Sequence, residues 1–197
     1  MSRNQECVAQ RGREPGLKLG CGSGDRAMKE WGEKLLADLD RLSEVCDAGT
    51  KVVVVGHVND VDLYRELSRR GRKVAILSRG YRGGPGGNDE ARVIARHLPD
   101  VPHLQDPDRF ASGSRIAETT DIFVLDDGFQ HLPLFRDLDV VLVDATDPFG
   151  GGFCPPVGRL REPLSALDRA TLVVLTRSDL VDRASLGETM RVVRAHT

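Results

Sequence analysis

The apolar residues of this chain gather in five short continuous runs, with helix-like segments between most of them. Continuous apolar runs of this length are typical of parallel strands that are buried on both faces of a sheet. The runs are residues 52–55 (VVVV), 74–77 (VAIL), 122–125 (IFVL), 140–143 (VVLV) and 172–175 (LVVL). Helices are expected over residues 60–70, 89–97 and 108–119. This alternation predicts an α/β fold with a mostly parallel, doubly wound sheet over residues 51–197.

Residues 26–48 show a different pattern, in which apolar residues recur at steps of three and four. These positions are Met28, Trp31, Leu35, Leu39, Leu42 and Val45. The spacing predicts one amphipathic N-terminal helix. Its apolar face either packs on the core of the domain or lies on a membrane surface. Acidic residues outnumber basic ones in this segment, which disfavours contact with anionic lipid and favours packing on the core.

Residues 1–25 hold few large apolar side chains and many Gly, Arg and polar residues. Such a segment buries too little apolar surface to offset the entropy lost on ordering, so we expect a disordered tail. The segment is also too polar to be a secretory signal. No apolar run in the chain approaches the roughly 20 residues that a membrane-spanning helix requires, so we expect no such helix.

Composition narrows the classes of function. The chain of 197 residues has a formal net charge of -2, and this balance gives no indication of nucleic-acid binding. The four cysteines, Cys7, Cys21, Cys46 and Cys154, show neither a CxxC pair nor a metal-ligand spacing. This pattern favours free thiols in a reducing compartment, so we expect a cytoplasmic protein.

The first loop with candidate chemistry follows the apolar run at residues 74–77. Residues 78–87 (SRGYRGGPGG) combine Arg79, Tyr81 and Arg82 with a series of glycines. Parallel sheets bind ligands at the carboxyl ends of their strands, and arginine at such a place suits phosphate through bidentate hydrogen bonds. The alternative is a mobile surface loop, because glycine-rich loops are common.

A second loop follows the run at residues 122–125 and begins with Asp126 and Asp127. A carboxylate pair after a buried parallel strand is where nucleotide-binding sheets place a ligand of Mg²⁺. Gln130 and His131 follow within the same loop. The alternatives are that an aspartate only caps the turn and that His131 is a packed, hydrogen-bonded side chain.

Six motifs occur in a fixed order along the chain. They are residues 76–84 (ILSRGYRGG), 88–91 (NDEA), 126–131 (DDGFQH), 148–152 (PFGGG), 161–170 (REPLSALDRA) and 173–179 (VVLTRSD). In this order they resemble the tetraacyldisaccharide 4'-kinase family of lipid A biosynthesis, which has a fold of the P-loop nucleotide hydrolase type. The resemblance implies transfer of the γ-phosphate of ATP, with Mg²⁺, to the 4'-hydroxyl of a tetraacyl glucosamine disaccharide. It also implies peripheral contact with the cytoplasmic face of the inner membrane, where the lipid A precursor lies.

The resemblance implies roles residue by residue. Asp89 falls where the family keeps the carboxylate that takes the proton from the sugar hydroxyl, with Glu90 beside it. Without the resemblance, Asp89 is equally explained as a helix N-cap. His131 joins them as a catalytic group, and Asp126 and Asp127 match the metal-site pair. Nucleotide and substrate contacts are expected from Arg79, Tyr81, Arg82 and Gln130.

The chain departs from the family directly after residues 52–56. Family members carry a Walker A loop there, G-x-x-x-x-G-K-[ST], whereas Gly56 is followed here by HVNDVD. No lysine lies between Lys51 and Lys73. The chain also ends at Thr197, soon after the last motif, so we expect a shortened member without the family's C-terminal portion. Because a phosphate-binding loop is missing, we predict impaired kinase activity.

Two other functions stay open. A catalytically inactive family remnant would bind nucleotide, sugar-lipid or a protein partner without turnover. A GTPase-like protein is suggested only by residues 176–179 (TRSD), where Arg177 stands in place of the lysine that GTPases use beside guanine. The missing phosphate loop weakens the GTPase interpretation as well.

Overall fold

The computed structural model describes residues 18–21, 52–56, 61–80 and 89–197. Three sequence predictions fall elsewhere in the chain and are not tested by it. The amphipathic helix over residues 26–48, the loop residues Tyr81 and Arg82, and most of the segment that replaces the Walker A loop, residues 57–60, lie outside the described residues.

The described strands form one sheet in the order β1-β7-β6-β2-β5-β3-β4, and every neighbouring pair is parallel. The strands are β1 (Lys18–Cys21), β2 (Val52–Gly56), β3 (Val74–Ser78), β4 (His103–Gln105), β5 (Ile122–Asp126), β6 (Leu138–Asp144) and β7 (Leu172–Thr176). Each of the five apolar runs lies in a strand, and in β3, β5 and β7 the residues of the run are buried almost throughout. The predicted α/β fold with a parallel sheet is therefore confirmed.

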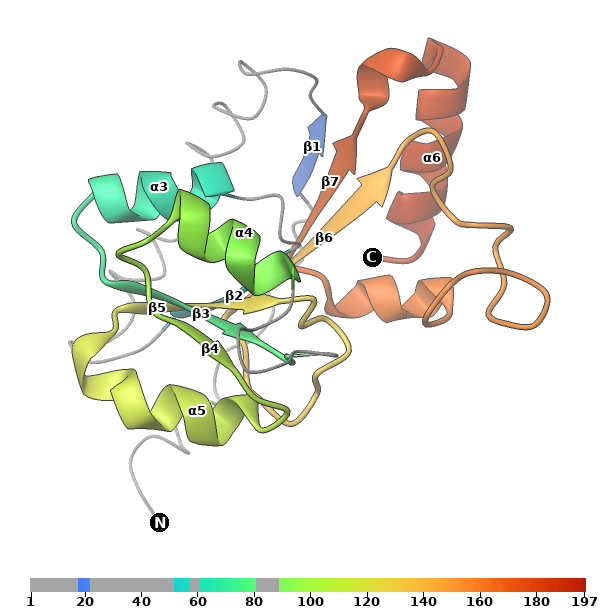
Figure 1. Ribbon diagram of the computed structural model, residues 1–197. Helices are drawn as coiled ribbons and strands as arrows, with labels where there is room; N and C mark the ends of the chain where they lie inside the picture. Colours follow the sequence, from blue (N-terminus) through green and yellow to red (C-terminus); the bar gives the residue numbers. More distant parts are fainter. Residues whose placement is uncertain (1–17, 22–51, 57–60, 81–88) are drawn as a thin grey trace.

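Helices cover both faces of the sheet, with α3 and α4 on one side and α5 on the other (Figure 1). The α-helices are α3 (Val61–Arg69), α4 (Asp89–His97), α5 (Arg109–Ile116) and α6 (Arg183–Ala195). In the described ranges, three short 3-10 helices complete the connections: η1 (Ala117–Thr119), η2 (Leu164–Arg169) and η3 (Ser178–Leu180). Helices on both faces of a parallel sheet make the fold doubly wound.

Alternate residues of β3, β5, β6 and β7 belong to different parts of the core, as strand geometry requires. Ile76 and Val124 pack on the side of α3 and α4, in one cluster with Leu67 and Ile94. Residues between them in the strands, such as Phe123, pack on the opposite side beneath α5. A third cluster lies on this second face, where η2 and α6 cover β6 and β7. The sheet is thus buried on both faces, which explains its continuous apolar runs.

One prediction about the N-terminal segment needs correction. Residues 1–25 were expected to be disordered, but Lys18–Cys21 forms β1 and pairs in parallel with β7. Composition measures how much apolar surface a segment can bury, and it carries no information about backbone pairing with a distant strand. The unpaired edge of β7 supplies hydrogen-bonding groups that such a polar segment can use.

Among the described residues, no helix combines the length and the apolar character needed to cross a membrane.

Candidate functional site

The carboxyl ends of the strands meet at one edge of the sheet. Gly56 pairs with Asp126, so β2 and β5 end level with each other. Asp144 pairs with Thr176 at the ends of β6 and β7 in the same way. Side chains that follow different strands are therefore brought together at this edge, where open parallel sheets bind their ligands.

The two aspartates after β5 lie in different environments. Asp126 is the last residue of β5 and only 2% of it is exposed. Asp127 is exposed and adopts a left-handed backbone conformation, with φ of 46°. Its two carboxylate oxygens accept hydrogen bonds of 2.6 and 2.5 Å from Nη1 of Arg161, which follows β6. The exposed aspartate thus joins the loop after β5 to the loop after β6.

Arg109 is a residue of this edge that the sequence did not single out. It is the first residue of α5, directly after the N-cap Asp108, whose carboxylate accepts a hydrogen bond from the backbone N–H of Ala111. Only 5% of Arg109 is exposed, and burial lowers the pKa of its guanidinium. Asp126 and Asp127 act in the opposite direction and raise that pKa, so the cation lies within electrostatic reach of both carboxylates.

The guanidinium of Arg109 has unused hydrogen-bonding capacity. Its Nε and Nη1 atoms are buried, and within the described part of the chain neither has a hydrogen-bond partner. Buried polar groups normally have partners, so an exception indicates a missing ligand, water or ion. A phosphate or carboxylate oxygen would satisfy these two donors. No pattern in the sequence marks this arginine, because its importance follows from its burial in the folded chain.

His131 lies in the same electrostatic neighbourhood. It is partly buried, and burial lowers the pKa of its imidazole. The cations of Arg109, Arg136 and Arg79 lower this pKa further, and Asp108 opposes them. The neutral imidazole is therefore the main form near pH 7, which leaves one ring nitrogen able to accept a hydrogen bond.

The structure brings four of the predicted site residues to one neighbourhood: Arg79, Asp126, Asp127 and His131 all lie within electrostatic reach of Arg109. Gln130 lies on the same turn and is exposed. Asp89 and Glu90 begin α4, which the structure describes there only as backbone. Their roles, like those of the other site residues, stay predictions.

The carboxylates at this edge fit a magnesium ion only in a limited way. No group of three or more His, Cys, Asp or Glu side chains that could hold a metal occurs among the described residues. Mg²⁺ is usually held by one or two carboxylates, with water and substrate phosphates as the remaining ligands. Asp126 and Asp127 could supply the carboxylate ligands if a bound phosphate supplied others. Arg161 would compete with the metal for Asp127.

The ends of β6 and β7 carry further ion pairs. Arg177 contacts Asp144 and Arg159 contacts Asp147. Arg177 has a left-handed φ of 53° and directly precedes η3, which contains Asp179. The arginine that stands in place of the GTPase lysine is thus engaged in an exposed ion pair with the end of β6.

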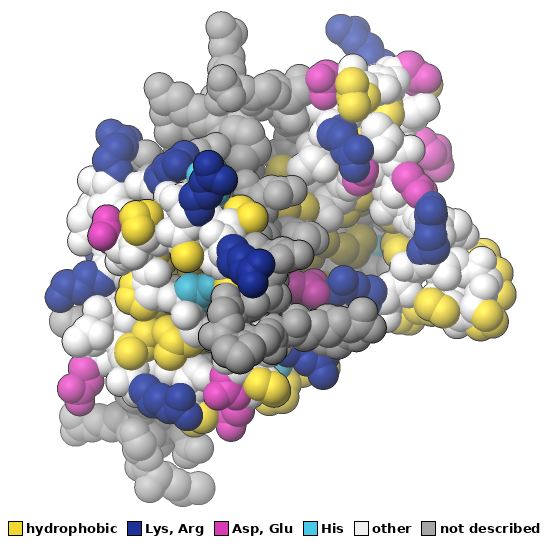
Figure 2. Space-filling model, viewed as in Figure 1, with side chains coloured by type: hydrophobic (Ala, Val, Ile, Leu, Met, Phe, Trp, Pro, Cys, Tyr) yellow, Lys and Arg dark blue, Asp and Glu magenta, His cyan; other side chains and the backbone are white. Residues whose placement is uncertain are grey.

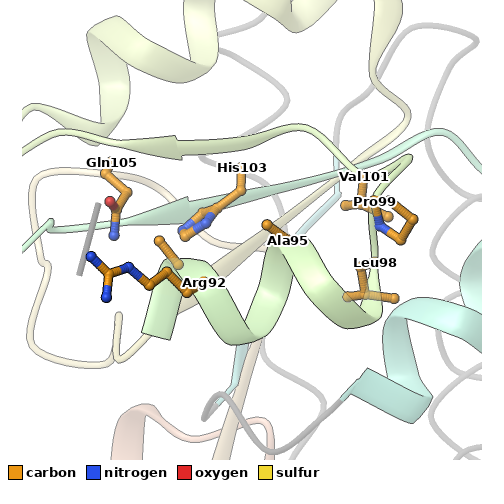
Figure 3. Close-up of a pocket in the computed structure, with 8 residues that line it drawn as sticks. Arg92, Ala95, Leu98, Pro99, Val101, His103 and Gln105 are labelled. Carbon is orange, nitrogen blue, oxygen red and sulfur yellow. The ribbon is translucent and has the colours of Figure 1, made fainter. Parts of the chain in front are cut away.

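A pocket of about 340 Å³ lies elsewhere, between α4 and β4 (Figure 3). Arg92, His103 and Gln105 form its polar end, and Leu98, Pro99 and Val101 form its apolar end. Beside it, Ser78 Oγ and His103 Nε2 form a hydrogen bond of 2.8 Å, and burial lowers the pKa of His103. None of the predicted site residues lines this pocket. The Ser78–His103 contact joins β3 to the edge strand β4.

Comparison with known proteins gives a consistent result. A family model described as tetraacyldisaccharide-1-P 4'-kinase matches residues 42–196. The tetraacyldisaccharide 4'-kinase of Anaeromyxobacter sp. (strain Fw109-5) is 40% identical over 167 residues, which are 71% of this chain and 45% of that protein. The enzyme of the same name from Geobacter metallireducens is 41% identical over 133 residues, covering 57% of this chain and 39% of that protein. The chain thus spans less than half the length of these curated relatives.

A solved structure is similar as well. The crystal structure of LpxK from Aquifex aeolicus in complex with ATP superposes with a TM-score of 0.55 and 28% sequence identity. The superposition covers 77% of this chain and 57% of that one.

Proposed function

Because the chain belongs to the tetraacyldisaccharide-1-P 4'-kinase family, we propose that its carboxyl-edge site binds ATP and a lipid A disaccharide precursor for transfer of the γ-phosphate. The acceptor is the 4'-hydroxyl of a tetraacyl glucosamine disaccharide. The observation that carries this proposal is the buried Arg109, whose guanidinium has unsatisfied N–H groups and lies within electrostatic reach of two carboxylates at the carboxyl edge of a parallel sheet. A cation of this kind suits a phosphate oxygen.

The proposed roles of the other residues follow from their chemistry. Asp126 or Asp127 would hold Mg²⁺, which neutralises phosphate charge when it is bound with ATP. Asp89, at the start of α4, is the proposed base for the sugar hydroxyl, with Glu90 beside it. The neutral imidazole of His131 would act as a hydrogen-bonding group in the same site. Contacts with nucleotide and sugar are proposed for Arg79, Tyr81, Arg82 and Gln130.

We infer that turnover is impaired. The sequence between Gly56 and Asp62 lacks the lysine, the Ser/Thr and the second glycine of a Walker A loop. Losing one preorganised donor to developing charge costs roughly 3 to 4 kcal/mol, and such losses are not simply additive. A deficit equal to two of them is about 6 to 8 kcal/mol, or on the order of 10⁴ to 10⁶ in rate.

The lipid precursor also suggests where the protein works. We propose that it acts in the cytoplasm, in peripheral contact with the inner membrane. In the space-filling view, basic side chains are prominent on the surface over α3 and α4 (Figure 2). Exposed arginines there, such as Arg69 of α3 and Arg96 of α4, carry the charge that anionic lipid head groups attract.

A second function is favoured by a specific contact. Arg161 occupies both oxygens of Asp127, which would otherwise be available to a metal. A family member that binds nucleotide, sugar-lipid or a protein partner without turnover would tolerate such a contact. The two functions differ in whether phosphate is transferred.

The test is transfer of labelled γ-phosphate from ATP to a tetraacyl disaccharide acceptor by the purified chain. We expect slow transfer, reduced by a factor on the order of 10⁴ or more relative to a full-length relative, because the phosphate loop is missing. Asp89→Ala should abolish the remaining activity, and Asp100→Ala is the control, an exposed aspartate after α4. ATP binding without any transfer would favour the inactive binding protein. Rapid transfer that depends on Asp89 would show that another segment supplies the phosphate contacts.

A further inference from the structure

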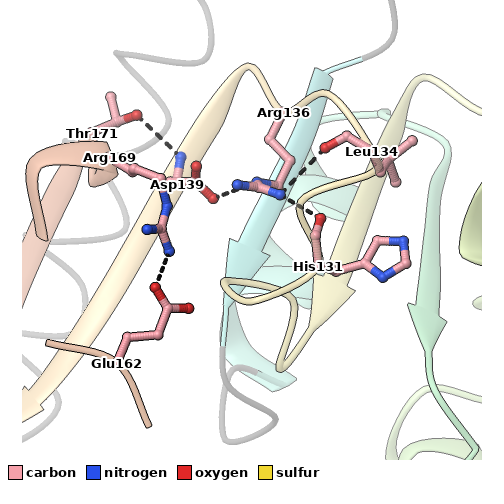
Figure 4. Close-up of polar contacts among 7 residues, drawn as sticks. All are labelled: His131, Leu134, Arg136, Asp139, Glu162, Arg169 and Thr171. Atoms are coloured by element: carbon pink, nitrogen blue, oxygen red, sulfur yellow. Dashed lines mark hydrogen bonds and ion pairs between the residues drawn. The ribbon is translucent and has the colours of Figure 1, made fainter. Parts of the chain in front are cut away.

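The loop between β5 and β6 carries Asp127 and His131, and it is held by a buried arginine at its far end. Arg136 precedes β6, and only 7% of its side chain is exposed. Its Nη1 donates a hydrogen bond of 2.6 Å to the backbone carbonyl of His131 and a longer one, of 3.3 Å, to that of Leu134 (Figure 4). One guanidinium thus satisfies two carbonyl groups of an irregular segment.

Arg136 is itself fixed by β6. Its Nε donates to Oδ1 of Asp139 at 2.8 Å, and the Asp139 side chain is only 10% exposed. Two hydrogen bonds join the backbone of Asp139 to Thr171. The N–H of Thr171 donates to the carbonyl of Asp139, and the N–H of Asp139 donates to Oγ1 of Thr171. The carbonyl of His131 is therefore connected through Arg136 to β6 and, through the backbone of Asp139, to the residue that precedes β7.

A second contact holds the other side of the loop. The guanidinium of Arg169 lies 4.5 Å from the ring centroid of Phe129, and its Nη2 donates to Glu162 at 2.6 Å. Glu162 directly follows Arg161, which binds Asp127. The first part of the site loop is thus attached to the segment between β6 and β7, and its far end is attached to β6 itself.

A buried ion pair is weak support for stability, because the cost of removing both charges from water can exceed their attraction. The geometry of the Arg136–Asp139 pair has a more specific consequence. The planar guanidinium binds the carboxylate through Nε and the carbonyl of His131 through Nη1 at the same time. A lysine ammonium cannot reproduce this fork.

We propose that Arg136, held by Asp139, is a positioning residue that fixes the backbone at His131 and so determines where the imidazole lies in the carboxyl-edge site. The effect on catalysis rests on the proposed function, since displacement of a catalytic group by about 1 Å can cost on the order of 10²-fold in rate. The placement of His131 by Arg136 does not depend on whether phosphate is transferred. Arg136 acts through His131, whose backbone carbonyl it holds.

The experiment compares Arg136→Lys with the unaltered protein by NMR of the histidine rings, with His131→Gln used to identify the His131 signals. Arg136→Lys keeps the charge and loses the fork, so we expect the His131 ring signals to shift. Amide exchange at the non-proline residues of this segment, His131, Leu132, Leu134 and Phe135, should become roughly tenfold faster, the effect of losing about one charge-assisted hydrogen bond. Arg191→Lys is the matched control, because Arg191 also pairs with a carboxylate three residues away, Glu188, but on the exposed surface of α6.

Asp139→Asn provides a second variant in case Arg136→Lys does not fold, and it should produce the same change at His131 because it weakens the anchor of the guanidinium. A folded variant with lower thermal stability but unchanged His131 signals and exchange would overturn the proposal and leave Arg136 a purely structural residue. Because neither measurement requires phosphate transfer, absence of kinase activity in the unaltered chain would contradict the proposed function and leave this inference standing.

Discussion

At the scale of single residues, the turn after β5 packs tightly around Gly128, with no room for a side chain there. Gly128 follows Asp127, and a Cβ atom placed on it would lie 2.6 Å from Cβ of Leu125. The same atom would lie 3.3 Å from Nη1 of Arg109. Leu125 is fully buried, so it has little freedom to move away. The absence of a side chain at Gly128 is therefore what lets the buried guanidinium approach the turn.

We predict that Gly128→Ala destabilises the protein by about 1 to 3 kcal/mol, because overpacking forces neighbouring groups from their positions. Gly187→Ala is the matched control. Gly187 lies inside α6, where an added Cβ meets nothing within 4 Å, and replacing a helical glycine by alanine should stabilise by roughly 0.5 to 1 kcal/mol. Urea unfolding measures both free energies. A Gly128→Ala protein as stable as the original would show that the turn can relax.

The sequence predicted some of these residues and missed others, for physical reasons. Asp126 and Asp127 were identified because they directly follow an apolar run, and the end of a strand is a local feature. Arg109 was missed, since its neighbours in space come from β5 and the turn after it. Burial of a charged side chain by distant segments leaves no mark in the residues next to it.

At the scale of elements, the sequence predicted the strands that lie between the two edges of the sheet. Burial on both faces demands apolar residues at every position, and β3 and β5 show this burial throughout. The edge strand β4 was not predicted, because its three residues, His103 to Gln105, are only partly buried and include two polar side chains. The strand β1 was missed for a similar reason, since its backbone pairing with β7 does not depend on an apolar sequence.

The short helix α5 positions Arg109, and we expect its N-cap to matter for this reason. Asp108 accepts a hydrogen bond of 2.9 Å from the N–H of Ala111, and the helix that follows contains Gly113 and two serines, which are poor helix formers. Asp108→Ala should cost about 0.5 to 2 kcal/mol of unfolding free energy, and Asp108→Ser should retain most of the stability. Chemical denaturation provides the comparison. Equal stability of the two variants would mean that Asp108 does not act as a cap.

At the scale of the whole molecule, the site depends on three separate connections of the sheet. Arg109 follows β4, Asp127 and His131 follow β5, and Arg161 follows β6. The parallel pairing of the strands brings these connections to one edge. Ligand binding there should therefore be coupled across the molecule, because a ligand that draws Asp127 toward itself must weaken the contact with Arg161.

This coupling gives a prediction about magnesium. Mg²⁺ alone should bind weakly, since it depends on phosphate oxygens and water for most of its ligands and Arg161 already binds Asp127. ATP supplies phosphate oxygens as further ligands, so we expect its presence to raise the affinity for Mg²⁺ at least about tenfold. By thermodynamic linkage, Mg²⁺ must raise the affinity for ATP by the same factor. Isothermal titration calorimetry in both orders of addition measures the two factors.

Variants after β5 and after β6 test whether Asp126 and Asp127 hold the metal. Asp126→Asn or Asp127→Asn should reduce the coupling between Mg²⁺ and ATP, because each removes one anionic ligand. Arg161→Gln should have the opposite effect on Mg²⁺ alone and strengthen its binding, since it releases the carboxylate of Asp127. The exposed ion pair itself contributes little to stability, so this variant should remain folded. If both aspartate variants leave metal binding unchanged, the two carboxylates only shape the turn after β5, and Mg²⁺ is held elsewhere or not at all.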